Sequence, residues 1–134
     1  MVRKFIAIAV ALFIVSAAHA GPKEHCVASG EVFSNAMTAE ALRLSFAEVR
    51  DWRRTDYYSL PQEFRTLVEQ SLVQMRPEVQ SIVDTVMGKI PKWNKDGHDG
   101  RSIARQIMLG GFRQSSDDFA VMCLKTLEAQ GHKF

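Results

Sequence analysis

The longest regular pattern of apolar residues runs from Phe64 to Ile90. Apolar or small side chains recur there at steps of three and four positions, which places them on one face of an α-helix. They are Phe64, Leu67, Val68, Ser71, Leu72, Met75, Val79, Ile82, Val83, Val86, Met87 and Ile90. Pro77 lies within this pattern, and proline cannot donate the backbone hydrogen bond to the residue four positions earlier. The pattern therefore predicts either one helix kinked at Pro77 or two helices laid nearly end to end.

The residues that flank this pattern predict where the helical region starts and stops. Ser59 and Gln62 have the spacing of a capping box, and Pro61 lies in the first turn, where its missing N–H costs little. Gly88 and Pro91 follow the last apolar positions and are typical of a helix end. We therefore expect the helical region to be capped by Ser59 and to end near Gly88.

A second pattern predicts a helix that begins at Thr38. Threonine is a favoured N-cap residue, and Met37 and Leu42 have the positions of a hydrophobic staple across that cap. The face that we expect to be buried carries Ala41, Leu42, Ser45, Phe46, Val49 and Trp52. A shorter helix over residues 26–35 precedes it, and Gly30 lowers its helical propensity.

Two further helices are predicted after a polar loop at residues 94–100. The first ends at Gly110 and Gly111, and the last begins with the capping spacing of Ser115 and Asp118. Their apolar faces carry Ile103, Ala104, Ile107, Met108 and Phe112 in the first and Phe119, Met122, Cys123 and Leu127 in the last, before Gly131. No stretch alternates apolar and polar residues as a half-buried strand does. We therefore predict an all-α fold, a small irregular bundle of five or six short helices.

The first twenty residues have the pattern of a secretory signal peptide. Arg3 and Lys4 precede an unbroken apolar run of 11 residues, and the segment ends in small residues at Ala18 and Ala20. Eleven apolar residues are too few to span a bilayer as a helix. We expect cleavage after Ala20, a single helical domain over residues 21–134, no membrane span after cleavage, and a periplasmic or secreted location.

Cleavage changes the charge of the chain. The whole sequence has a formal charge of +2, and loss of Arg3 and Lys4 leaves 15 basic against 15 acidic side chains. Proteins that bind nucleic acids need an excess of Lys and Arg to contact phosphates. The neutral mature chain therefore predicts no nucleic-acid partner.

Cys26 and Cys123 are the two cysteines of the chain. In an exported protein they meet an oxidising compartment, where two cysteines suffice for one disulfide. We predict that this disulfide joins the N-terminal segment to the last helix. Closing a loop of about 100 residues stabilises a fold by at most about 4 to 5 kcal/mol.

The polar loop at residues 94–100 does not have the spacing of a calcium site. An EF-hand loop needs Gly at position 6 and Glu at position 12, and a loop counted from Asn94 has Asp99 and Arg105 there. His98 alone is more typical of a turn residue than of a metal ligand. We therefore expect no metal and no cofactor.

Arginine and aromatic residues gather in the segment from Arg50 to Tyr58. Trp, Tyr and Arg dominate the binding energy of protein interfaces, because they bring a large area with a polar tip. The candidate partner-binding residues are Arg50, Trp52, Arg53, Arg54, Tyr57 and Tyr58. The competing interpretation places Trp52 and one tyrosine on the core and the arginines at the end of a helix, where cations are favourable.

No motif of a hydrolase, zinc protease, nucleotide-binding loop or dithiol oxidoreductase is present. In architecture the chain is similar to many small exported bacterial proteins, including helical immunity proteins that neutralise toxins, although it carries no family motif. We predict a non-catalytic module, such as an inhibitor or immunity-type protein, that binds another exported or periplasmic protein. The alternatives are a carrier of a small ligand or lipid, suggested by methionines at 37, 75, 87, 108 and 122, and a small enzyme.

Overall fold

A computed structural model describes residues 21–131 of the chain. The predicted signal peptide of residues 1–20, its cleavage site and residues 132–134 lie outside the described residues. Within residues 21–131 there are four longer helices, two short ones and no strand, which confirms the all-α class. The longer helices are α2 (Pro22–Phe46), α4 (Gln62–Met87), α6 (Gly100–Gly110) and α7 (Arg113–Ala129), and the short ones are α3 (Thr55–Tyr58) and α5 (Ile90–Lys95).

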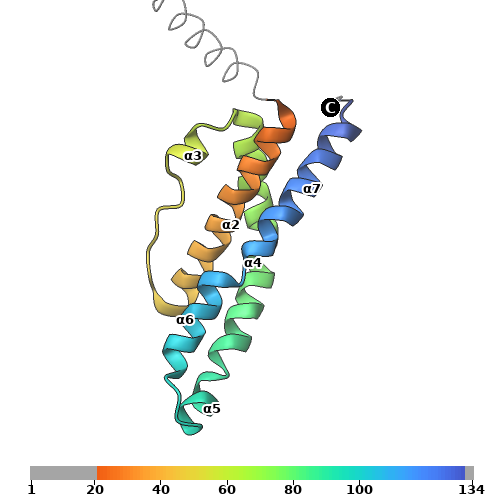
Figure 1. The fold of residues 1–134 in the computed structure, drawn as a ribbon. Coiled ribbons are helices and arrows are strands. Elements are labelled where there is room, and N and C mark those ends of the chain that lie inside the picture. Colours follow the sequence, from red (N-terminus) through yellow and green to blue (C-terminus); the bar gives the residue numbers. More distant parts are fainter. Residues whose placement is uncertain (1–20, 132–134) are drawn as a thin grey trace, which may run out of the picture.

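The helices are arranged around α2. Helices α4, α6 and α7 all pack against α2, whereas α4 and α7 make few direct contacts with each other. Residues 47–54, which we call the strap, run back beside α2 and lead into α3 (Figure 1). The bundle is therefore built on one central helix, with the strap on one side of it and α7 on the other.

The first two predicted helices form one helix of 25 residues. Thr38 is not an N-cap, because its Oγ1 donates a hydrogen bond to the Ser34 carbonyl oxygen at 3.0 Å, inside α2. Gly30 is buried, and a Cβ at this position would lie 2.3 Å from the Ser116 carbonyl oxygen of α7. Glycine is thus used for a close approach of two helices, and the contact offsets its low helical propensity.

Helix α2 ends at Phe46, whereas the predicted buried face continued for six more residues, to Trp52. Ala47 has a φ of 54°, in the left-handed region, and turns the chain into the strap. Val49 was expected in the core, but 88% of it is exposed. The helical spacing of Val49 after Phe46 is therefore a coincidence of sequence, since no helix continues through it.

Helix α4 is a single helix that passes through Pro77. Its buried residues are Phe64, Val68, Ser71, Leu72, Val79, Val83 and Val86. Ile82 was predicted to be buried and is 43% exposed. The reason is that α2 covers only a narrow face of α4 and α7 does not close over the rest, so the outer edge of the predicted face remains in solvent.

Three of the predicted helix ends need correction. Ser59 does not cap α4, because its Oγ donates to the Thr55 carbonyl oxygen at 2.6 Å and Pro61 is the N-cap. Pro91 lies in the first turn of α5 instead of ending a helix, a position where proline is tolerated. Helix α7 begins at Arg113, before Ser115, but ends before Gly131 as predicted, where φ is +91°.

The predicted disulfide is present. The Sγ atoms of Cys26 and Cys123 are 2.09 Å apart, their Cα atoms are 5.6 Å apart, and both residues are fully buried between α2 and α7. The rings of Phe33 and Phe119 lie beside it along the same helix pair, 4.8 Å apart. Across residues 21–131, no helix has the length and apolarity needed to cross a membrane.

Candidate functional site

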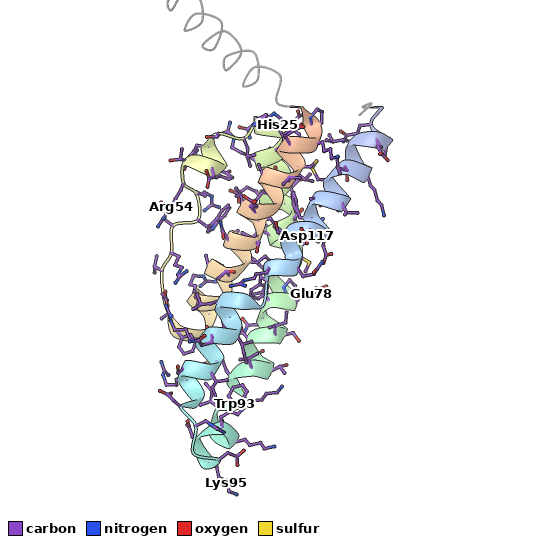
Figure 2. The ribbon with its side chains drawn as sticks, in the orientation of Figure 1. His25, Arg54, Glu78, Trp93, Lys95 and Asp117 are labelled. Atoms are coloured by element: carbon purple, nitrogen blue, oxygen red, sulfur yellow. A yellow bond between two sulfur atoms is a disulfide. The ribbon has the colours of Figure 1, made fainter. Side chains whose placement is uncertain are left out.

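The six candidate partner-binding residues lie on the strap and on α3. Arg50, Trp52, Arg53 and Arg54 belong to the strap, and Tyr57 and Tyr58 belong to α3. Figure 2 shows Arg54 on the outer side of the strap, away from α7. Trp52 and Tyr57 are at least partly buried, whereas the three arginines and Tyr58 are exposed, and each arginine also forms a hydrogen bond that holds the strap.

One end of the strap is attached to α6 through Glu48. The Glu48 carboxylate accepts hydrogen bonds from Arg105, at 3.1 Å from Nη2 to Oε1 and 3.2 Å from Nε to Oε2. Arg50 Nε donates to the same carboxylate at 3.0 Å. The hydrogen bond from Arg105 is the main cause of a lowered pKa of Glu48, and the bond from Arg50 adds to it. Glu48 therefore remains charged and fixes the start of the strap.

The other end of the strap is attached to α4 through Glu69. Arg53 donates two hydrogen bonds to this carboxylate, at 2.7 Å from Nε and 2.9 Å from Nη2, and the Tyr57 hydroxyl donates a third at 3.0 Å. The bond from Arg53 is the main cause of a lowered pKa of Glu69. Burial, more than this contact, raises the pKa of Tyr57.

Aromatic packing completes this attachment. The guanidinium of Arg53 lies over the ring of Trp52, 4.1 Å from its centroid, and the rings of Trp52 and Tyr57 meet edge to face at 5.4 Å. Trp52 is partly buried against the core and Tyr57 is buried. Three of the six candidates, Trp52, Arg53 and Tyr57, thus have a structural role in this fold.

The strap is also held from within. The Asp51 carboxylate accepts the N–H of Arg53 at 3.1 Å, the contact of an Asx turn, and Arg54 Nε donates to the Asp51 carbonyl oxygen at 2.9 Å. Most side chains of the strap and of α3 are exposed, and among them we call Val49, Arg50, Arg54 and Tyr58 the strap surface. Sequence reasoning missed Val49, because neither Gly nor Pro marks the end of α2.

A groove separates the strap from α2. It consists of two adjoining hollows of about 360 and 380 Å³ that share Val32, Asn35 and Asp56. Arg50 and Arg54 line the first hollow, and Glu24 and Glu31 line the second. Each hollow has the volume of a ligand pocket, so the groove has room for side chains of a partner that binds the strap surface.

The polar loop before α6 has structural tasks. Asn94 Oδ1 accepts the N–H of Gly100 at 2.9 Å, and the Asp99 carboxylate caps α6 by accepting the N–H of Ser102 at 3.1 Å. Among residues 21–131, no three His, Cys, Asp or Glu side chains are grouped so that they suit a metal ion. Both cysteines are in the disulfide, so neither is available as a nucleophile.

Neither a protein-family model, nor a curated protein, nor a solved structure matches this chain. A function therefore has to be inferred from the geometry of the strap and the groove.

Proposed function

We propose that this chain is an exported, non-catalytic protein-binding module of the inhibitor or immunity type, and that the strap surface contacts its partner. One observation carries the proposal. The strap is an irregular segment attached at both ends by paired charges, yet it leaves Val49, Arg50, Arg54 and Tyr58 in solvent.

The attachments matter because binding costs less when a loop is already ordered. A free loop loses conformational entropy when it docks, whereas the strap has lost this entropy on folding. Arginine and tyrosine are also the residue types that contribute most at protein interfaces. A rigid loop that presents them is therefore suited to bind another protein.

The exported location is supported by the disulfide. Disulfides persist in oxidising compartments and are rare in the cytosol. Cys26 and Cys123 form such a bond, and it connects two helices that are far apart in the sequence. This agrees with the signal-peptide pattern of residues 1–20, and it favours a partner in the periplasm or outside the cell.

The hollows of the described residues favour a protein partner over a carried ligand. The hollows between the strap and α2 are open to solvent and are not enclosed cavities. A carrier of lipids or small molecules buries most of its ligand in a concave pocket. Of the five methionines that suggested a carrier, Met37 and Met108 are fully buried core residues, and Met75, Met87 and Met122 are partly buried against the core.

The proposal is tested by photo-crosslinking in cells that naturally produce the protein. A photoreactive phenylalanine replaces Val49 or Tyr58, and the control replaces Ile82, an exposed apolar residue of α4. We expect one discrete protein adduct from positions 49 and 58 that position 82 does not give. Arg54→Glu should lower the adduct yield about tenfold, while Lys92→Glu, an equal charge change on α5, should leave it unchanged. The same adducts from position 82, or none from position 49, would contradict the proposal.

A further inference from the structure

Helices α4 and α7 leave one side of the bundle open. Both pack against α2, and the backbones of α4 and α7 stay farther from each other than from α2. The outer face of α7 is a shallow open surface lined by Asp118, Val121, Met122, Lys125, Thr126 and Ala129, and a hollow of about 150 Å³ lies between the two helices. Figure 1 shows α7 and the strap on opposite sides of α2, so this open side is separate from the strap surface.

The open side presents apolar side chains. Val121 of α7 is 52% exposed, and Met122 beside it is only partly buried. On α4, Leu67 lines the smaller hollow and is only partly buried. This apolar area is available for contact with another molecule.

Two opposite charges flank the apolar pair of α7 symmetrically. Asp118 precedes Val121 by three positions, and Lys125 follows Met122 by three positions. The two charges are about 10 Å apart along the helix axis, too far to pair within one chain. Asp118 accepts a hydrogen bond from the amide of Gln114 at 3.4 Å, and no ion pair involves either charge among the described residues.

We propose that a second copy of this chain docks here, with its α7 antiparallel to the first and a twofold axis between Val121 and Met122. In this arrangement Asp118 faces Lys125 of the other copy, and by symmetry the pair occurs twice around an apolar centre. A parallel arrangement would instead place like charges opposite each other, which is unfavourable. The charge pattern therefore selects both the partner and its direction.

The dimer has a consequence for binding. The strap surface lies on the other side of α2, so a dimer through α7 presents two copies of it at once. Two linked binding surfaces hold a multivalent partner more strongly than either does alone. The dimer itself does not depend on the function proposed for the strap.

The test is sedimentation of the purified disulfide-bonded protein from about 1 to 100 μM at low salt. We expect a dimer, and Asp118→Lys or Lys125→Asp should each raise its dissociation constant at least about tenfold, since each change replaces both symmetric attractions by repulsions. The double variant with both changes should recover the affinity of the original chain to within about threefold. A chain that is monomeric throughout, single variants that dimerise equally well, or no recovery in the double variant would overturn the proposal.

Two controls keep the result interpretable. Asp118 and Lys125 are exposed, so circular dichroism should show melting temperatures within a few degrees for all variants. Lys92→Glu changes a charge on α5, at the far end of the bundle from α7 (Figure 1), and should leave the dimer intact. If a variant unfolds, the proposal is tested instead by the salt dependence of the dimer of the unmodified protein. Its dimer should weaken as salt screens the pairs, and a dimer that is indifferent to salt would overturn the assignment.

Discussion

The contact between α2 and α7 and the attachment of the strap hold this molecule together in different ways. The first is apolar, buried and covalently closed, with the Cys26–Cys123 disulfide and the contact between the rings of Phe33 and Phe119. The second combines exposed ion pairs, such as Arg53 with Glu69, with the smaller aromatic contact of Trp52 and Tyr57. Both regions have defined geometry, but only the first should contribute much to stability.

The difference follows from solvation. Buried apolar side chains gain several kcal/mol by leaving water, whereas an exposed ion pair gains about 1 kcal/mol or less because water and salt screen it. The ion pairs of the strap therefore position it while contributing little to stability, and its stabilising contacts are those of Trp52 and Tyr57 with the core. A binding surface on such a segment tolerates change without loss of the core.

The largest effect should come from the disulfide. Cys123→Ser opens a loop with a sequence separation of 97 residues, and it should lower the free energy of unfolding by about 3 to 5 kcal/mol. In a domain of this size the melting temperature should fall by more than about ten degrees. Thermal melts followed by circular dichroism measure this fall. Reductant added to the variant should have no further effect, because the variant has no disulfide. A fall of only a few degrees would show that packing alone holds α7 in place.

Leu42 and Val49 provide a direct comparison of core and strap. Both were predicted on one buried helical face, but Leu42 is fully buried and Val49 is almost fully exposed. Leu42→Ala should cost about 3 kcal/mol through lost contacts and a cavity, and Val49→Ala less than about 0.5 kcal/mol. Urea unfolding gives both values. Similar costs at the two positions would mean that Val49 is covered in the folded protein.

Gly30 and Gly110 allow a comparison between a closely packed position and an open one. Gly30→Ala places a Cβ against the Ser116 backbone and should cost about 2 kcal/mol, because α2 and α7 must separate. Gly110→Ala is the matched control, since a Cβ there meets no atom within 4 Å. It should be neutral or stabilise by up to about 1 kcal/mol through better helical propensity. If Gly30→Ala were as harmless, the helices would not be in the close contact described.

Removing the Glu69 carboxylate should have a small effect that depends on pH. Its pKa in the folded protein is lowered by Arg53, so its stabilisation is present above the unfolded value near 4.5 and is lost as the pH falls through the folded value. Glu69→Gln should therefore cost at most about 1 kcal/mol at pH 7. The gap in the free energy of unfolding between Glu69→Gln and the original chain should close in strong acid. Urea unfolding at several pH values tests this, and a gap that widens on acidification would contradict it.

Some features of the protein were determined by local sequence. The apolar spacing in α4, α6 and α7 predicted helices, because a repeat near 3.6 residues is itself the geometry of a helix. The disulfide was predictable for a different reason, since two cysteines within one chain allow a single pairing. Neither inference required knowledge of which helix packs against which.

The ends of helices were harder to predict. Thr38 and Ser59 are favoured N-cap types, but in the structure each hydroxyl bonds to the carbonyl of the preceding turn. The same side chain makes either bond, and the position of the helix within the bundle decides between them. Pro77 was ambiguous for a related reason, because only the packing of both halves of α4 on a common core shows that one helix continues through it.

The candidate site was decided by tertiary structure. The sequence identified the segment of residues 50–58, but its chemistry did not distinguish the arginine that anchors from those that face solvent. Arg53 is an anchor because α4 brings Glu69 to it, and the chain has 15 acidic residues among which no pattern singles out Glu69. Helical spacing describes a few turns of chain, whereas an ion pair between Arg53 and Glu69 depends on how two separate elements are folded together.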